Sequence, residues 1–425
     1  MLLLCRPGLT LDVTMWTHGI LVMTVGLAYS ISDQSVVHGL SNETEIHKLT
    51  SAVSMFSNDL YRTLAVNAVN IVYSPFSIHT ALSMAYLGAR EETELSMQTT
   101  LRLSKFISLE SHFVAFDLIN DVTQMDTVQV YVANGMWLNA SFKVFQDYQE
   151  VTSVLYNAVS QNIDFTSPDG PETPINSWVA NQTRNQITSF LLPNTISLDT
   201  RLILINTFYF NGTWKSPFDG AFTKKDTFTL SNGSQIETDF MMQTEEYGVK
   251  FSTVEGIDVI RIPFKKNRFA FYIALPRSVS GLNDFEQKLM KESFDINHLF
   301  TDLEKTYVNL KMPKFKLTAS IHLTRSLKDL GMAIAFGPKA NFSGISDQDL
   351  FISDVVQKAT IEVQEAGVTA SAASGVLLKD VAFFESSVDF YVDHPFMFFL
   401  RDDDIELILV AGKLTVPALT EISLD

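Results

Sequence analysis

The sequence predicts an α+β fold in which helices and strands build one large domain. Three observations carry this prediction: helix-type spacing of apolar residues near the start, many strand-type segments after residue 127, and no linker or repeat dividing the chain. With 46% hydrophobic and 19% charged residues among 425, the chain has enough apolar material for a large core. Disorder is therefore excluded as its main state.

The first 30 residues have the pattern of a secretory signal peptide. Their apolar run, residues 19–28 (GILVMTVGLA), is shorter than the stretch of about 20 residues that spans a bilayer. Small residues follow at 28–30 (Ala-Tyr-Ser), at a spacing that a signal peptidase accepts. Met15 is an alternative start of translation, and a buried helix or single anchor is the alternative reading. We expect residues 1–30 to be removed and the protein to be secreted, extracellular and free of the membrane.

Six Asn-x-Ser/Thr triplets agree with export, although each alone is a weak signal. They begin at Asn42, Asn139, Asn181, Asn211, Asn232 and Asn341. Asn211 and Asn341 lie against apolar stretches, where we expect burial and no modification. The single cysteine, Cys5, lies in the leader, so the mature chain would have no disulfide and no thiolate metal site. Residues 31–45 are expected to be an N-terminal extension, and residues 46–425 the domain.

Helix patterns come first along the domain. Apolar residues recur at three- and four-residue steps from Leu49 to Leu64, before the break at residues 73–75 (Tyr-Ser-Pro). A second helix is expected over residues 77–88, whose small apolar side chains suit packing on all sides. Helices return between residues 144 and 191, including the stretch 175–191. We expect about nine helices in all.

Strand patterns dominate after residue 127, and several are apolar throughout, as in central strands covered on both faces. The predicted strand segments are residues 128–138, 201–214, 259–264, 269–276, 307–317, 390–400 and 406–414. They predict a large central mixed sheet with additional sheets.

Catalytic and nucleic-acid-binding signatures are absent from the sequence. There is no G-x-S-x-G, G-x-x-x-x-G-K-[ST], G-x-G-x-x-G or H-E-x-x-H motif, and no two of the eight histidines lie at an i, i+4 spacing. His79, on the apolar second helix, is predicted to be a hydrogen-bonded core residue. With 31 basic and 48 acidic residues, the net charge of −17 opposes nucleic-acid binding. We expect no enzyme, no cofactor and no metal; a catalytic triad built from distant residues has no positive support.

One segment, residues 366–378 (AGVTASAASGVLL), is uncharged and mostly small. No proline occurs between Pro338 and Pro395, so every residue of the segment keeps the amide donor that a sheet requires. Alternation would turn residues 368, 370, 372, 374, 376 and 378 to one face, and 369, 371 and 373 to the other. Composition alone leaves open whether the segment is a flexible linker or enters a sheet.

The chain resembles the serpin family over nearly all of its length after the leader. Seven ordered motifs carry the resemblance: residues 74–78 (SPFSI) with 87–90 (LGAR), 175–179 (INSWV), 204–206 (LIN) with 210–214 (FNGTW), 312–315 (MPKF), 340–345 (ANFSGI), 362–367 (EVQEAG) and 394–396 (HPF). The resemblance implies a single-domain serpin fold with an exposed reactive-centre loop at about residues 366–390. It also implies a suicide inhibitor: a serine protease cleaves the loop, and the acyl-enzyme is trapped when the loop inserts into the central sheet.

The resemblance also implies roles for residues of the loop. Its hinge would comprise Glu365, Gly367, Val368, Thr369, Ala370, Ser371, Ala372 and Ala373. Residues 367–373, its leading end, include no proline and no bulky or charged residue. Non-inhibitory relatives commonly spoil this hinge, so its intact form favours inhibition. Counting seventeen residues from Glu365 places the reactive bond at Val381–Ala382, which suits an elastase-like protease. Phe383 or Phe384 would instead indicate a chymotrypsin-like target, and Lys379 a trypsin-like one.

Other family positions match a polar cluster beneath the sheet where the strands part. Ser74, Ser77 and Asn206 correspond to it, Gln357 replaces its usual histidine, and Trp214 matches a residue packed where insertion begins. Glutamine cannot gain a charge near neutral pH, so we expect weakened pH dependence of opening through this site. Glu91 stands where relatives often have glycine, and Val416 where they often have asparagine.

The expected partner is a serine protease, elastase-like first and chymotrypsin-like second. Some relatives bind heparin through a basic helix after the motif at residues 88–90, but here residues 91–106 open with acidic residues and hold only Arg102 and Lys105. The sequence therefore argues against heparin binding, and we expect a monomer. The alternative function is that of a non-inhibitory serpin with a carrier, chaperone or storage role.

Overall fold

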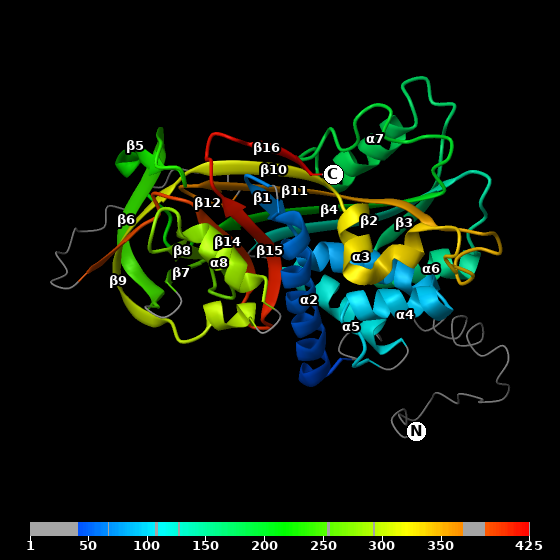
Figure 1. Cartoon of the computed structure of the whole chain (residues 1–425), viewed down its shortest axis with the longest axis horizontal. Helices are drawn as coiled ribbons and strands as arrows, with labels where there is room; N and C mark the ends of the chain where they lie inside the picture. Colours follow the sequence, from blue (N-terminus) through cyan, green and yellow to red (C-terminus); the bar gives the residue numbers. More distant parts are fainter. Residues whose placement is uncertain are drawn as a thin grey trace.

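The computed structural model describes residues 41–66, 68–106, 109–125, 128–252, 256–291, 294–368 and 387–424. The predicted signal peptide and most of the predicted extension lie outside these ranges. Helices and two large sheets together form the α+β architecture that the sequence predicts (Figure 1). Within the described ranges, no helix combines the length and the apolar character needed to cross a bilayer.

Eight α-helices occur among the described residues, close to the expected number. They are α2 (Glu43–Leu64), α3 (Pro75–Gly88), α4 (Glu91–Thr100), α5 (Glu110–Thr123), α6 (Gln146–Tyr156), α7 (Glu172–Gln182), α8 (Gly281–Leu289) and α9 (Thr324–Leu327). Single-turn segments lie at Gly220–Phe222, Ile296–Phe300, Lys328–Met332 and Ala333–Phe336. Helix α2 begins earlier than the predicted domain start at residue 46, because Asn42 and Glu45 form a reciprocal capping box at its first turn.

The first sheet has seven strands and carries the site described below. In spatial order they are β16 (Glu421–Leu424), β10 (Phe315–His322), β11 (Ile352–Gln364), β12 (Gly367–Val368), β4 (Leu202–Thr213), β2 (Val128–Asn139) and β3 (Ala158–Ile163). The long strands β11 and β4 run parallel and pair directly from Ile352 opposite Leu202 to Thr360 opposite Tyr209.

The second sheet has nine strands. Eight of them run in the order β1 (Ile71–Tyr73), β15 (Leu407–Leu414), β14 (Phe396–Asp402), β8 (Phe269–Pro276), β7 (Ile257–Pro263), β6 (Gln235–Phe251), β9 (Glu304–Pro313) and β13 (Val388–Tyr391), and β5 (Lys224–Thr229) pairs with β6. The apolar segment at residues 307–317, predicted as one strand, passes from β9 in this sheet to β10 in the other. Strands β8 and β15 are buried at every residue, as their apolar sequences predict.

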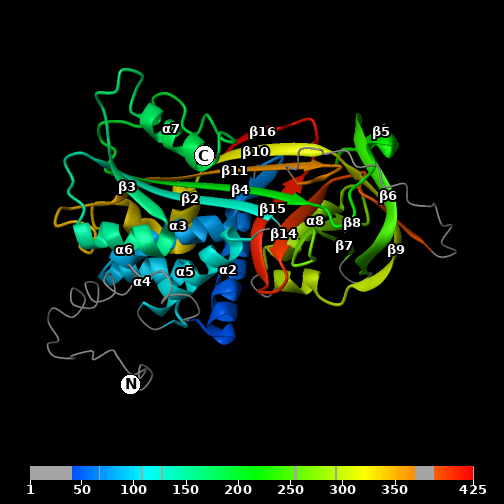
Figure 2. The ribbon, with the colours of Figure 1, turned by 180° about the vertical axis from the view of Figure 1, so that it is seen from behind.

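Helices cover both faces of the seven-stranded sheet (Figures 1 and 2). Helix α7 lies over one face, where Trp137, Ile175 and Val179 belong to a separate hydrophobic cluster. Helices α3, α5 and α6 lie against the opposite face, α2 packs on α3 and on β15 of the other sheet, and all four join the main core.

The predicted helix over residues 175–191 is too long. Helix α7 ends at Gln182 because Arg184 and Asn185 adopt left-handed backbone conformations, with φ of 50° and 62°. The amide of Asn185 donates to Ala180 O at 2.7 Å, closing the helix end. The apolar residues beyond it, Ile187 and Phe190, are still buried, which explains why the sequence continues a helix-like pattern.

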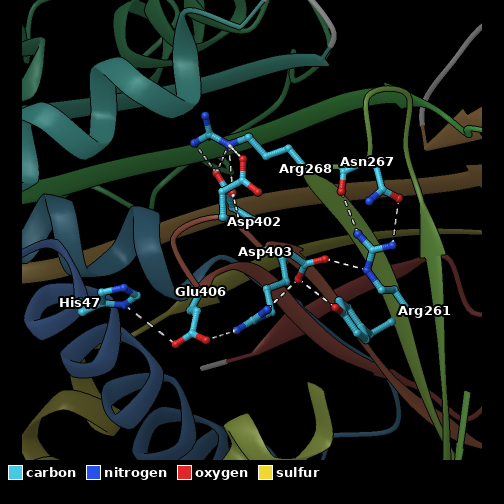
Figure 3. A network of polar contacts seen from close by, with 10 residues as sticks. His47, Arg261, Asn267, Arg268, Asp402, Asp403 and Glu406 are labelled. Atoms are coloured by element: carbon cyan, nitrogen blue, oxygen red, sulfur yellow. Dashed lines mark hydrogen bonds and ion pairs between the residues drawn. The ribbon is translucent and has the colours of Figure 1, made fainter. Parts of the chain in front are cut away.

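A charge network holds the turn between β14 and β15 against the rest of the molecule (Figure 3). Asp402, fully buried, accepts hydrogen bonds from Arg268, with a shortest N–O distance of 2.6 Å. Arg268 also pairs with Asp121 of α5. Burial by itself lowers the pKa of Arg268, but its hydrogen bonds to Asp402 and Asp121 raise it more, so its charge is secure.

Asp403, the next residue, extends this network to β7 and β8 of the nine-stranded sheet. It accepts from Arg261 Nε at 2.7 Å, from Arg401 Nη1 at 2.6 Å and from Tyr272 Oη at 2.8 Å (Figure 3). The carboxylate of Glu406 lies beside this group: its Oε1 is 3.6 Å from Arg401 Nη2, and its Oε2 is 3.9 Å from Nδ1 of His47 in α2. The network ties α2, α5, β7, β8 and β14 into one frame.

Candidate functional site

The site lies where β11 and β4 part at one end of the seven-stranded sheet. There β12 enters between them and pairs antiparallel with both: Val368 lies opposite Val363 and Gly212, and Gly367 lies opposite Gln364 and Thr213. The Val368 side chain is fully buried. Two residues of the small-residue segment thus already occupy the beginning of a slot between two parallel strands.

Gly367 is required at its position by close backbone contacts. A Cβ atom on this residue would lie 2.0 Å from Gly212 O and 2.8 Å from Thr213 Cα. Its φ of +156° is also one that residues with a side chain rarely adopt. Glycine therefore permits the chain to turn from β11 back into the sheet.

Trp214 holds the turn between β11 and β12 through two hydrogen bonds. Its indole Nε1 donates to Gln364 O at 2.9 Å, and its backbone amide donates to Ala366 O at 3.0 Å. The ring is fully buried and stacks on Phe264 with a centroid separation of 4.6 Å. Trp214 therefore anchors both the end of β11 and the start of the loop.

Glu365, within the same turn, holds it through hydrogen bonds of its carboxylate and its carbonyl. Its carboxylate accepts from Lys314 Nζ at 2.9 Å and from Thr223 Oγ1 at 2.8 Å, and its carbonyl accepts from the Phe218 amide at 2.9 Å. Burial raises the pKa of Glu365, but the hydrogen bonds from Lys314 and Thr223 outweigh it, and the pKa is lowered. The carboxylate is thus ionised and paired at neutral pH.

A buried polar cluster lies further along the same seam, at the paired residues Gln357 of β11 and Asn206 of β4. Gln357 Oε1 accepts from the Ser74 amide at 2.9 Å, and its Nε2 donates to Asn206 Oδ1 at 2.6 Å and to Ser74 O at 3.1 Å. Ser77 Oγ donates to Asn206 Oδ1 at 2.7 Å. Gln357, Asn206, Ser74 and Ser77 are all fully buried.

Asn134 of β2 is a member of this cluster that the sequence did not reveal. It lies opposite Asn206 and accepts from Asn206 Nδ2 at 3.0 Å. Its signal was a lone asparagine inside an apolar strand, a residue type that buried strands tolerate only with hydrogen-bond partners. The cluster therefore links β2, β4 and β11 to the first turn of α3, across the seam that an incoming strand would open.

The arrangement corresponds to a known family. Residues 51–417 match the family model described as "Serpin (serine protease inhibitor)". The chain belongs to the serpin family. Serpins are typically protease inhibitors and are not enzymes, which agrees with the absence of catalytic motifs in the sequence.

Individual serpins show how similar the chain is to known members. It is 34% identical to Serpin-Z2B of Triticum aestivum, over 83% of this chain and 91% of that protein. The crystal structure of Serpin48 of Tenebrio molitor, described as a highly specific serpin, matches with a TM-score of 0.80 at 29% identity, covering 89% of this chain and all of that one. Human thyroxine-binding globulin with bound thyroxine matches with a TM-score of 0.81 at 24% identity, over 88% of this chain and all of that one, a likeness of fold.

Several residues predicted from the serpin resemblance lie outside the described residues. They are Thr369, Ala370, Ser371, Ala372 and Ala373 of the hinge, and Lys379, Val381, Ala382, Phe383 and Phe384 around the reactive bond. The structure brings together the others: Glu365, Gly367, Val368 and Trp214 at the parting of the strands, and Ser74, Ser77, Asn206 and Gln357 in the polar cluster.

The six candidate glycosylation sites differ in exposure. Asn42, Asn181 and Asn232 are exposed, whereas Asn139, Asn211 and Asn341 are half-buried. The side-chain nitrogen of Asn211 donates to Gln129 Oε1 at 3.4 Å, and that of Asn341 to Glu91 Oε2 at 3.1 Å. The side-chain amides of Asn211 and Asn341 therefore have protein partners. The sequence analysis predicted that both residues are buried, and the structure shows them only half-buried.

The remaining sequence expectations concern metal and heparin sites. Within the described ranges, no group of three histidine, cysteine or acidic residues could hold a metal ion. His79 is buried and its Nε2 lies 2.9 Å from Leu101 O. Arg102, one of the two basic residues of the stretch 91–106, pairs with Asp59 at 2.6 Å. Glu91, where the serpin resemblance led us to expect glycine, has a φ of 53°, a left-handed conformation that glycine adopts readily.

Proposed function

We propose that this serpin is a secreted inhibitor that traps a serine protease by inserting its cleaved reactive-centre loop between β11 and β4. The observation that carries the proposal is β12: Gly367 and Val368 pair with both strands at the entrance of the slot. Inhibition needs a loop that can continue this pairing after the chain is cut. The sequence that follows Val368 meets that requirement.

The pairing of β12 defines the register that continued insertion would follow. In an antiparallel pair, the numbers of two opposed residues have a constant sum. For β12 and β4 this sum is 580, because Val368 lies opposite Gly212, and for β12 and β11 it is 731, because Val368 lies opposite Val363. Both sums put Ser371 between Tyr209 and Thr360, which face each other directly in the present sheet. The two registers are therefore compatible with one inserted strand.

The side chains of the loop suit the two faces of that slot. Val368 points to the buried face, so alternation assigns Ala370, Ala372 and Ser374 to the same face. In the same register Ser374 would arrive between Asn206 and Gln357, in the buried polar cluster described above. About a dozen new ladder bonds at roughly 0.5–1.5 kcal/mol each would supply on the order of 10 kcal/mol.

The target proposal rests on the sequence of the loop. Val381 is the proposed residue for the primary pocket of the protease, and a medium aliphatic side chain suits the shallow apolar pocket of an elastase-like enzyme. Phe383 and Phe384 make a chymotrypsin-like enzyme the second choice, and Lys379 a trypsin-like one the third. The signal pattern and the exposed triplets at Asn42, Asn181 and Asn232 support a secreted glycoprotein, which we propose to be monomeric.

Incubation with elastase-, chymotrypsin- and trypsin-like proteases tests this proposal. We expect an SDS-resistant complex with the elastase-like enzyme and, by mass spectrometry, cleavage after Val381. Ala370→Arg would place a charge on the buried face and should convert the inhibitor into a cleaved substrate. Ser371→Arg, on the opposite face of the inserted strand, is the matched control and should retain most complex formation.

Thyroxine-binding globulin, which shares this fold, gives the alternative of a non-inhibitory carrier a concrete form. Clean cleavage of the loop by every protease, without any covalent complex, would contradict inhibition and favour that alternative. Complex formation with cleavage well upstream of Leu378 would retain inhibition but contradict the proposed bond.

A further inference from the structure

Strand β16, the last strand among the described residues, lies beyond the part that the serpin family model matches, which ends at residue 417. It pairs parallel with β10, from Glu421 opposite Thr318 to Leu424 opposite Ile321. The Thr318 amide donates to Thr420 O at 2.8 Å just before the strand. Figures 1 and 2 both show β16 beside β10 at the border of the seven-stranded sheet.

A buried side chain directs the chain toward this position. Asn70 is fully buried, and its Nδ2 donates to Val416 O at 2.8 Å and to Leu419 O at 3.0 Å. Its Oδ1 accepts from the amides of Thr415 at 2.8 Å and Val416 at 3.1 Å. Four hydrogen bonds from one residue of the core therefore fix the turn that leads into β16.

The strand also contributes apolar side chains to the fold. Ile422 and Leu424 are half-buried and pack against the main core, whereas Glu421 and Ser423 are exposed. This alternation is that of an edge strand with one covered face. The ladder, the Asn70 contacts and the packing together place β16 as a built part of the sheet.

Strand β10 would be the border of the sheet without β16. Among the described residues, β16 is the only strand that pairs with the side of β10 turned away from β11. An open strand edge carries unpaired amides and carbonyls and is a template for another chain. With β16 in place, the border is instead a four-residue strand with an exposed Glu421, which is a poor template.

We propose that β16 is an edge cover that prevents two copies of this serpin from joining their large sheets through β10. The partner that the uncovered edge fits is a second copy, because β10 can pair antiparallel with its own copy about a twofold axis, which closes the assembly as a dimer. Charge does not oppose this pairing, since Lys316 of β10 is paired with Glu362 at 3.3 Å. The edge cover acts independently of loop insertion.

Removal of residues 420–425 tests the inference, because it deletes β16 and leaves the Asn70 contacts with Val416 and Leu419. Sedimentation velocity at tens of micromolar should show the full chain at one chain mass and the truncated chain shifting toward two chain masses with concentration. A synthetic peptide of residues 420–425 (TEISLD) should return the truncated chain to one chain mass. A truncated chain that stays folded and monomeric would overturn the inference, as would association that the peptide does not reverse.

A pair of proline variants tests the same inference in the full-length chain. The register of this parallel ladder turns the Ile422 amide toward β10 and the Ser423 amide away from it. Ile422→Pro removes a ladder donor and should promote dimerisation, whereas Ser423→Pro removes none and should not. Equal behaviour of the two variants would overturn the inference. Complex formation with protease, measured on the monomeric fraction, should be unchanged throughout, so the inference and the proposed function can fail separately.

Discussion

Gln357 is the residue on which the closed seam between β4 and β11 depends most. Replacement by leucine, Gln357→Leu, would leave the Ser74 amide and the carboxamide of Asn206 with fewer partners in a fully buried site. We expect a loss of about 2–3 kcal/mol in unfolding free energy, measured by urea denaturation. Gln161→Leu, at an exposed position of β3, is the control and should change stability by less than about 0.5 kcal/mol. Similar losses in both variants would contradict the role of the cluster.

His79 makes the stability of the protein depend on pH. Burial lowers its pKa to about 4, although the hydrogen bond to Leu101 acts in the opposite direction, whereas an unfolded histidine titrates near 6.5. The contribution of His79 to the free energy of unfolding is therefore fully present above about pH 6.5. Between about pH 6.5 and 4 only the unfolded chain binds the proton, so this free energy falls by about 1.4 kcal/mol per pH unit.

The variant His79→Gln should remove the uptake of about one proton on unfolding, and so reduce the slope of unfolding free energy against pH by about 1.4 kcal/mol per pH unit between pH 6.5 and 4. Urea denaturation at several pH values measures it, and His298→Gln, at an exposed position, is the control. His112 is also buried, with its pKa lowered to about 3 by burial and by His79, so part of the slope should remain. A slope unchanged by His79→Gln would contradict the assignment.

Elements differed in how far the sequence predicted them. Strands β8 and β15 were predicted because they are buried on both faces and, apart from Lys413 of β15, carry no charged residue. Strand β6 was missed because its sequence is largely polar and few of its residues are fully buried, so it shows no run of apolar residues. The end of α7 was missed because the residues after it remain apolar to fill the cluster under the helix, although the backbone has left the helical conformation.

The candidate site was predictable only in part for a related reason. Gly367, Trp214 and the polar residues were found through family motifs, whereas the pairing of β12 with both neighbouring strands depends on the three-dimensional separation of β4 and β11. Asn134 joins the cluster through a register that no local pattern encodes.

The two-residue strand β12 should be lost in Gly367→Ala, since the new methyl group would lie 2.0 Å from Gly212 O. We expect the hinge to leave the slot and amide hydrogen exchange at Val368 to accelerate at least tenfold, because its ladder partners are lost. Gly337→Ala, where no atom lies within 4 Å of the added carbon, is the control. Unchanged protection of Val368 would show that β12 tolerates the methyl group.

At the scale of the whole molecule, the charge network around Asp402 and Asp403 should stabilise the frame against which the large sheet opens. Arg268→Met leaves the buried Asp402 without its guanidinium and should cost about 3 kcal/mol. Arg277→Met removes a more exposed pair with Asp258 and should cost less than about 1 kcal/mol. Denaturant unfolding of both variants measures the difference, and equal costs would contradict a frame held by the buried pair.

Thermal unfolding of the intact and the loop-cleaved protein tests the account most directly. If the cut loop becomes a full strand between β11 and β4, a gain on the order of 10 kcal/mol should raise the midpoint of the nicked protein by more than about 10 °C. The expected companion signal is a change in tryptophan fluorescence, since Trp214 donates a hydrogen bond to the end of β11, and Trp178 of α7 packs against the hydrophobic cluster on the same sheet. Equal midpoints for the nicked and the intact protein would contradict loop insertion.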